Sequence, residues 1–326
     1  MADHAMPGGA QTSGLGRTQA AGRDWAGLIL GHGPNRGDKV LGYLFLLPSA
    51  VLLSILVLYP FSQVIFLGFY EKDTLLPDKT WVGLDNYLAF FQYPDLANAF
   101  RNTVYWTVGS VALEMLVGMV TALVLHQSLK FRTIARGIVL FPYLLPTIVA
   151  VLVWKFMLSS QVGIISSTIR QLGIGEAPLS ILARPETAML GVILVGTWKF
   201  FPFVVIALLG ILQSVPSDRY EAARCDGAGW WQEFRYITIP AILPVIMLTV
   251  LLRTIWTWDK FDIIYQLTGG GPLQATTTMS IYVYYEMFQQ FNQGRAAAVA
   301  MVMFLIMLTM TLVYTALYDR AERAQS

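Results

Sequence analysis

The segment LGYLFLLPSAVLLSILVLY, residues 41–59, contains no charged side chain. A helix that crosses the hydrocarbon core of a bilayer needs about 20 mostly apolar residues, so this segment is long enough to span a membrane. Further stretches of the same character cover residues 104–125, 137–157, 189–212, 241–258 and 297–317. The sequence therefore predicts an all-α, polytopic membrane protein with six transmembrane helices.

The composition of the whole chain agrees with this class. Of its 326 residues, 56% are hydrophobic and 13% are charged, whereas a soluble globular domain carries about 25% charged residues. Low charge and abundant aromatic residues also exclude a disordered chain. The net charge of +2 gives no reason to expect a nucleic-acid partner. The single cysteine, Cys225, excludes an internal disulfide.

Lys and Arg residues are distributed unevenly between the two sides of the six predicted spans. Twelve lie on the side that carries both termini and seven lie on the opposite side. Because cytoplasmic loops carry the excess of positive charge, we expect both termini to be cytoplasmic. The expected organisation is a flexible cytoplasmic N-terminal tail (1–38), a six-span transmembrane domain (39–318) and a cytoplasmic C-terminal tail (319–326).

The predicted cytoplasmic loop at residues 213–240 differs from an ordinary connection. Its sequence from 216 to 240 is PSDRYEAARCDGAGWWQEFRYITIP. Asp218 and Glu221 have the spacing of a capping box, which predicts a helix start, and Gly227 is a typical helix end. Three apolar residues at helical spacing predict a second short helix: Trp230, Phe234 and Ile237. On these residues alone, the hairpin could simply anchor the loop at the membrane surface.

The spacing of EAA at residues 221–223, Gly227 and Ile239–Pro240 resembles the EAA motif of binding-protein-dependent ABC importer permeases. That motif normally has leucine before the proline, where this chain has Ile239. The resemblance implies that the loop docks as a coupling helix into a cleft of a separate ATPase subunit. It assigns this coupling role to Glu221, Ala222, Ala223, Asp226 and Gly227.

The resemblance extends over residues 43–318 and has further motifs. WVGLDNY (81–87), FRNT (100–103), WKFFPF (198–203) and FDIIYQLTGGGP (261–272) are similar to the carbohydrate-uptake branch, which includes maltose-type and glycerol-3-phosphate-type permeases. This implies an ABC importer type I permease fold in a bacterial or archaeal cytoplasmic membrane. It also implies a second homologous permease, two ATPase subunits and an extracytoplasmic sugar-binding protein as partners.

A nucleotide-binding motif is absent from the sequence. No G-x-x-x-x-G-K-[ST] pattern occurs, so nothing in the sequence predicts a loop that cradles the phosphates of ATP. The triple glycine at 269–271 precedes Pro272 and is interpreted as an extracellular turn. We therefore expect a chain that is not an enzyme and binds no cofactor or metal, with ATP and Mg²⁺ bound by the partner ATPase.

Four ionisable residues fall within the predicted spans: Glu114, Lys155, Lys199 and Arg253. Such residues are costly in a membrane and usually face the interior of the bundle, where they serve function or structure. Lys199, beside Trp198, is a candidate for substrate contact, but it could equally brace the bundle. Glu114 could pair with either Lys199 or Arg253. We expect Lys155, near a span end, to snorkel outward.

Sugars are bound by hydrogen bonds to their hydroxyls and by stacking on aromatic faces. Aromatic and charged residues near the fourth and fifth spans are therefore candidates for a substrate pathway. The predicted pathway residues are Trp198, Lys199, Phe203, Arg253, Trp256, Asp262 and Tyr265. Tryptophan and tyrosine also gather at membrane interfaces, which is an alternative explanation for part of this set.

The function predicted from the sequence is half of the translocation pathway of an ATP-driven importer for a di- or oligosaccharide. An importer of glycerol-3-phosphate or a polyol on the same scaffold is the alternative. An ion-coupled secondary transporter would need internal repeats with paired broken helices and a buried carboxylate site, which we do not find. A membrane-embedded enzyme would need a catalytic cluster within the spans, and none is evident.

Overall fold

The computed structural model describes residues 36–127, 130–159, 163–172 and 181–323, and the chain divides into two compact units at residues 62 and 63. The first unit contains α2 (Arg36–Leu53), the π-helical turn η1 (Ser54–Leu58) and the start of α3 (Tyr59–Leu67). Residues 43–67 are long and apolar enough to cross a membrane. The predicted N-terminal tail lies almost wholly outside the described residues.

The second unit is a helical bundle with a short two-stranded sheet in which Tyr70 of β1 pairs with Trp81 of β2. Its elements up to the fourth predicted span are β1 (Tyr70–Lys72), β2 (Lys79–Trp81), α4 (Asp85–Gln92), α5 (Pro94–His126), α6 (Arg132–Leu144), α7 (Thr147–Met157), α8 (Ile164–Gln171), η2 (Ile181–Ala183) and α9 (Pro185–Leu212). The remaining elements are α10 (Ser217–Cys225), α11 (Trp230–Glu233), η3 (Phe234–Thr238), α12 (Ile239–Trp258), α13 (Asp262–Thr268), α14 (Met279–Phe288) and α15 (Gln293–Arg323).

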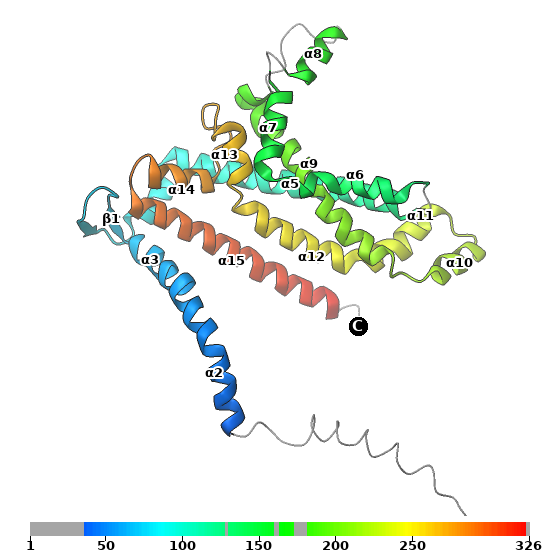
Figure 1. Ribbon diagram of the computed structural model, residues 1–326, viewed down its shortest axis with the longest axis horizontal. Helices are drawn as coiled ribbons and strands as arrows, with labels where there is room; N and C mark the ends of the chain where they lie inside the picture. The colour runs from blue at the N-terminus through cyan, green and yellow to red at the C-terminus, as the bar shows by residue number, and fades with distance from the viewer. Residues whose placement is uncertain (1–35, 128–129, 160–162, 173–180, 324–326) are drawn as a thin grey trace, which may run out of the picture. The chain divides into compact units, whose positions relative to one another are not determined.

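The long helices α5, α9 and α12 form the centre of this unit (Figure 1). Small residues let α5 and α9 approach closely, as is typical of membrane helices. A Cβ on Gly118 would stand 2.5 Å from the Val204 side chain, and one on Gly196 would stand 2.6 Å from the Trp106 ring. The buried Trp106 indole donates a hydrogen bond of 3.0 Å to the Thr257 carbonyl, which joins α5 to α12.

The third predicted span is not one continuous helix, because the chain breaks within it into two helices. Helices α6 and α7 meet at an angle of 96°. Pro146 has no N–H to donate and disfavours helical geometry at Leu145, which has φ −66° and ψ 139°. The described residues thus contain five helices able to span a membrane, or six if the bent pair is one span.

The fifth predicted span begins earlier than expected. α11, η3 and α12 follow one another without a break and form one candidate span from Trp230 to Trp258. The second short helix expected in the cytoplasmic loop is therefore the first part of this span. The π-helical turn η3 ends two residues before Pro240, as η1 ends two residues before Pro60, and such turns accommodate a residue that cannot donate its N–H.

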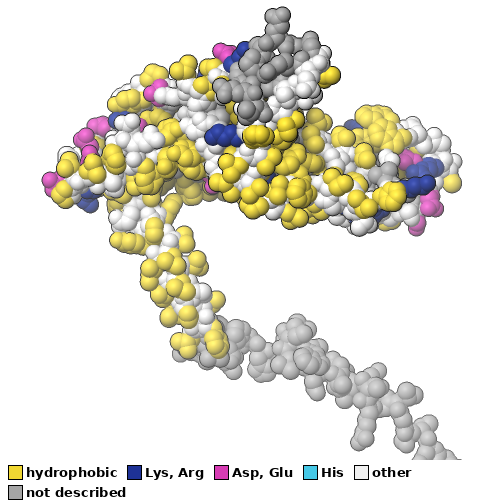
Figure 2. Space-filling view, turned by 45° about the horizontal axis from the view of Figure 1, so that its top comes forward, with side chains coloured by type: hydrophobic (Ala, Val, Ile, Leu, Met, Phe, Trp, Pro, Cys, Tyr) yellow, Lys and Arg dark blue, Asp and Glu magenta, His cyan; other side chains and the backbone are white. Residues whose placement is uncertain are grey.

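The outer surface of the bundle is largely hydrophobic. On α5, for example, Val108, Leu116 and Val120 are each more than half exposed. Figure 2 shows hydrophobic side chains over the visible face, while Lys, Arg, Asp and Glu side chains concentrate toward the ends of the bundle. Exposed apolar helices with charged ends are what a lipid environment requires. The protein is accordingly an integral membrane protein.

Candidate functional site

Helix α10 carries the EAA sequence and lies at one end of the bundle (Figure 1). None of its residues is buried. The helix ends as predicted at Gly227, whose φ of +82° is a left-handed conformation that glycine adopts without steric cost. The predicted capping box is wrong, because no side chain caps the helix start at Pro216.

The five residues assigned to coupling are accessible. Glu221, Ala222, Asp226 and Gly227 are exposed and Ala223 is partly exposed. Because two of them are alanine and one is glycine, another surface could approach the α10 backbone closely. No Cβ contact would arise within 4 Å at Gly227.

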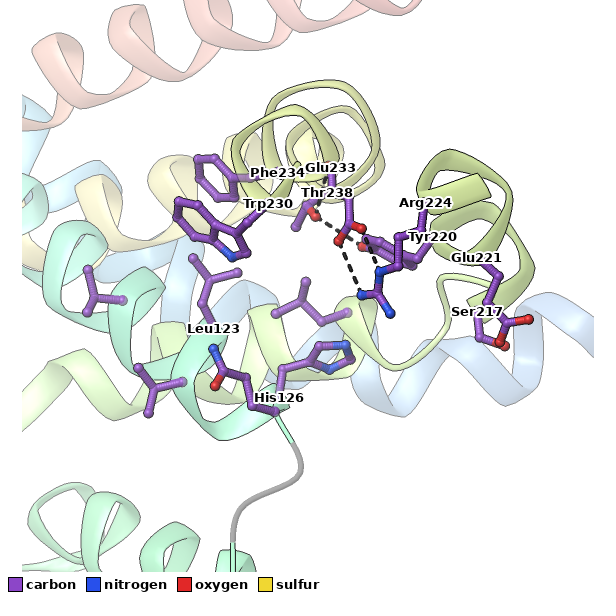
Figure 3. Close-up of a pocket in the computed structure, with 14 residues that line it drawn as sticks. Leu123, His126, Ser217, Tyr220, Glu221, Arg224, Trp230, Glu233, Phe234 and Thr238 are labelled. Carbon is purple, nitrogen blue, oxygen red and sulfur yellow. Dashed lines mark hydrogen bonds and ion pairs between the residues drawn. The ribbon is translucent and has the colours of Figure 1, made fainter. Parts of the chain in front are cut away.

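Two contacts within this loop were not predicted. The Arg224 guanidinium pairs with the Glu233 carboxylate, with Nε to Oε1 at 2.7 Å and Nη2 to Oε2 at 3.3 Å. The hydroxyls of Tyr220 and Thr238 lie 3.0 Å apart (Figure 3). The hydrogen bond to Glu233 raises the pKa of the Arg224 guanidinium, a group that is charged at physiological pH in any case.

A cavity of about 590 Å³ lies between this loop and the ends of two spans. Leu123 and His126 come from α5, Tyr220 comes from α10, and Trp230 and Phe234 come from the start of the fifth span. Figure 3 shows these side chains surrounding the cavity, with the Arg224–Glu233 pair at one edge. Its lining is mostly apolar, with the titratable groups of His126, Glu221 and Arg224 at its margin.

Lys199 is 2% exposed in the interior of the bundle, and its ammonium group donates hydrogen bonds at the bend between α6 and α7. Its Nζ donates to the carbonyls of Pro142 at 3.0 Å, Tyr143 at 3.1 Å and Leu145 at 2.5 Å. A lysine ammonium has three N–H donors, and the interrupted helix leaves carbonyls without a helical donor. The contacts therefore match the bracing alternative of the two roles considered for Lys199.

Glu114 pairs with Arg253, one of the two partners that the sequence left open. Arg253 Nε lies 2.6 Å from Glu114 Oε2, and Nη2 lies 2.7 Å from Oε1. The side chains of Arg253 and Glu114 are 6% and 1% exposed. This bidentate pair ties α12 to α5 deep in the bundle, where an unpaired charge would be costly.

Three cations surround the ring of Phe200 on α9. The distances to the ring centroid are 5.7 Å for Lys199 Nζ, 4.9 Å for the Arg253 guanidinium carbon and 5.0 Å for Lys260 Nζ. Such contacts with an aromatic face are favourable. The structure thus brings Lys199 and Arg253 together as candidate pathway residues and adds Phe200 and Lys260, which sequence reasoning missed.

The aromatic pathway candidates on α9 and α12 do not form one cluster but belong to two separate aromatic pairs. Trp198 packs edge-on against Trp154 of α7, with ring centroids 5.5 Å apart. Phe203 packs against Trp256, 43% exposed, with centroids 5.1 Å apart. The two pairs lie on either side of the Lys199 position along α9.

Asp262 and Tyr265 lie beyond the fifth span, on α13. Asp262 Oδ1 stands 3.5 Å from Lys260 Nζ. Tyr265 stacks on Phe261 with ring centroids 4.8 Å apart and also contacts the Tyr284 ring. Its hydrogen bond with Tyr284 raises the pKa of the Tyr265 hydroxyl.

The FRNT motif anchors the loop that follows α13. Asn102 donates to the carbonyls of Gln274 and Thr277, and the Thr103 hydroxyl accepts the N–H of Met279. These bonds attach the loop after α13 to α5. Its predicted turn is observed, with positive φ at Gly269 and Gly270.

Within the described ranges, no group of three or more His, Cys, Asp or Glu side chains is arranged to hold a metal ion.

Comparison with solved structures identifies the fold. One match is a chain from the crystal structure of a bacterial alginate ABC transporter in complex with an alginate pentasaccharide-bound periplasmic protein. Its TM-score is 0.76 at 22% identity, covering 93% of this chain and 97% of that one. A second match, from a bacterial ABC transporter involved in alginate import, has a TM-score of 0.75. The fold is that of an ABC importer permease.

Comparison of sequences gives the family. Residues 114–324 match the family described as binding-protein-dependent transport system inner membrane component, and the chain belongs to that family. It is 35% identical over 277 residues to the trehalose/maltose transport system permease protein MalF of Thermococcus litoralis, covering 85% of this chain and 93% of that protein. It is 31% identical to the sulfoquinovosyl glycerol transport system permease protein SmoG of Agrobacterium fabrum, covering 85% of this chain and 90% of that protein.

Proposed function

We propose that this chain is one permease half of an ATP-driven ABC importer for a di- or oligosaccharide, coupled to a separate ATPase through α10. The observation that carries the proposal is the exposed EAA helix at one end of the bundle, with no buried residue and a glycine turn at its end. Two relatives are named for the transport of trehalose and maltose and of sulfoquinovosyl glycerol, which supports the substrate class.

The partners in this proposal are a second homologous permease, two ATPase subunits that bind ATP and Mg²⁺, and an extracytoplasmic sugar-binding protein. The proposed orientation places α10 and both termini in the cytoplasm. The excess of Lys and Arg on that side supports it. The substrate would pass Trp198, Phe203, Trp256 and the outer residues Asp262 and Tyr265, which offer aromatic faces and polar groups.

A phosphorylated or otherwise anionic sugar derivative is the second candidate substrate. The observation in its favour is the group of three cations around Phe200, of which Arg253 and Lys260 have carboxylate partners while Lys199 donates to backbone carbonyls. Among the described residues, the Lys199 ammonium forms no ion pair with a carboxylate, so its charge would favour an anionic substrate nearby.

Uptake measurements in sealed proteoliposomes test the proposal. The chain is reconstituted with its cognate permease, ATPase and binding protein, and labelled maltose, trehalose and glycerol-3-phosphate are supplied outside. We expect uptake only with ATP inside and binding protein outside. Uptake driven by a proton or sodium gradient without ATP would contradict the proposal.

Gly227→Val tests the coupling role of α10. Valine is β-branched and strained at φ +82°, so the turn after α10 is expected to change its path. We expect at least about a tenfold loss of ATP-driven uptake with normal membrane insertion, because a small displacement of a positioned contact is enough for such a loss. Gly210→Val, at a site with free space around it, is the matched control. Normal transport by the Gly227 variant would show that the turn is not needed for coupling.

A further inference from the structure

Helix α10 is not held in place by hydrophobic packing. None of its nine residues is buried, and the cavity of about 590 Å³ lies between it, the end of α5 and the start of the fifth span. A helix in this position would not keep its orientation through burial of apolar surface, which is what normally holds a short helix. Its attachment must therefore depend on particular polar contacts.

Two such contacts join α10 to the start of the fifth span. Arg224 forms the two-point contact with Glu233, and Tyr220 shares a hydrogen bond with Thr238. The groups on α10 are accessible, with the Arg224 side chain 65% exposed. Their partners are buried, at 8% exposure for Glu233 and 6% for Thr238. The buried groups of Glu233 and Thr238, called the seat below, thus hold the accessible side chains of α10.

The seat is continuous with the interior of the bundle. Glu233 ends α11 and Thr238 ends η3, and the helix continues from there through α12. Arg253 on α12 then makes the buried bidentate pair with Glu114 on α5. A displacement of α10 that keeps the Arg224–Glu233 contact would therefore displace α12 and, through it, α5.

We infer that Arg224 is a positioning residue that transmits the movement of α10 to the fifth span through Glu233, with Tyr220 and Thr238 as a second fastening. This rests on the proposed function, because it specifies how the coupling helix is connected to the transmembrane helices. Without the fastening, α10 can follow a bound ATPase while α12 stays in place. The result is ATP hydrolysis without transport.

The experiment compares Arg224→Gln with Arg219→Gln in the reconstituted importer. Arg219 is an exposed arginine on the same helix and has no ion pair among the described residues, so it controls for the loss of one positive charge. Three quantities are measured: labelled maltose uptake, ATP hydrolysis, and the amount of ATPase that copurifies with the permease. Arg224→Lys keeps the charge but cannot make the two-point contact.

We expect Arg224→Gln to lower uptake about fivefold or more while hydrolysis and copurification stay within about twofold of the unchanged protein, because only the contact between α10 and the seat is lost. Arg224→Lys should give an intermediate ratio of transport to hydrolysis, and Arg219→Gln should leave it unchanged. Exchanging the charges, with Arg224→Glu and Glu233→Arg together, should recover part of the transport lost by either change alone.

Two results would overturn the inference. An unchanged transport-to-hydrolysis ratio in Arg224→Gln would show that the fastening carries no movement. Loss of copurifying ATPase would show that Arg224 is a docking contact instead. Failure of the proposed function itself would look different, because the unchanged protein would then take up maltose independently of ATP.

Discussion

Lys199→Met is expected to destabilise the transmembrane bundle by about 3 kcal/mol, if each of three orphaned carbonyls costs roughly 1 kcal/mol. The change removes the donor for the carbonyls of Pro142, Tyr143 and Leu145 at the bend between α6 and α7. Pro146 cannot replace it, since proline has no N–H. Removing the buried ammonium relieves some desolvation, but the methionine thioether leaves the carbonyls without any donor.

The measurement is the thermal unfolding of the detergent-purified protein, followed by tryptophan fluorescence. The control is Lys155→Met, because Lys155 donates to a single carbonyl, that of Gln266, at 3.3 Å. The relative uptake of maltose, trehalose and glycerol-3-phosphate separates the two roles considered for Lys199. A brace predicts lower stability with unchanged selectivity. Wild-type stability with an altered order of substrates would instead establish Lys199 as a substrate contact.

Glu114→Ala is expected to cost about 3–5 kcal/mol, the cost typical of breaking a buried ion pair by removal of one partner. The Arg253 guanidinium, 6% exposed, would be left in the bundle without its carboxylate. Its contact with the Phe200 ring at 4.9 Å offsets only part of that loss. The measurement compares the unfolding of the purified variant by urea or heat with that of the unchanged protein.

The double variant Glu114→Met with Arg253→Met shows whether an uncompensated buried charge causes the expected loss of stability. Two apolar side chains of similar length leave no buried charge, so the double variant should be more stable than either single change to Met. Strictly additive losses would mean that each side chain stabilises the bundle by packing alone. Glu286 and Arg295, whose side chains are 7% and 25% exposed and whose charged atoms stand 3.5 Å apart, provide a less buried comparison pair.

Apolar runs were sufficient to predict the class of fold and the approximate positions of the spans. A helix that faces lipid needs apolar side chains along its whole length, so a long apolar run is a sufficient signal for a span. The 96° bend was missed because the segment 137–157 stays apolar through the break. Pro142 and Pro146 were its signal, but a proline in a membrane helix often produces only a kink. The direction of the chain after Pro146 depends on Lys199, which lies more than 50 residues away.

Helix α10, to which we assign the coupling role, could be located from the sequence, but its contacts with the fifth span could not. Gly227 marks a helix end through a local backbone requirement, so one residue was enough to predict the turn. Arg224 and Glu233 are nine residues apart, with a turn between them, and no helical period relates them. Likewise, nothing local favoured Arg253 over Lys199 as the partner of Glu114. That choice depends on which faces of α5 and α12 meet.

The surface position of α10 separates the residues that determine folding stability from those that face outward on this helix. A residue that is buried in the bundle changes the stability of the whole protein when it is replaced, whereas exposed substitutions usually change stability by less than about 0.5 kcal/mol. Because α10 has no buried residue, we expect its outward-facing residues to tolerate substitution while the bundle remains folded. In the coupling role that we propose, a change of partner would then need substitutions in only one nine-residue helix.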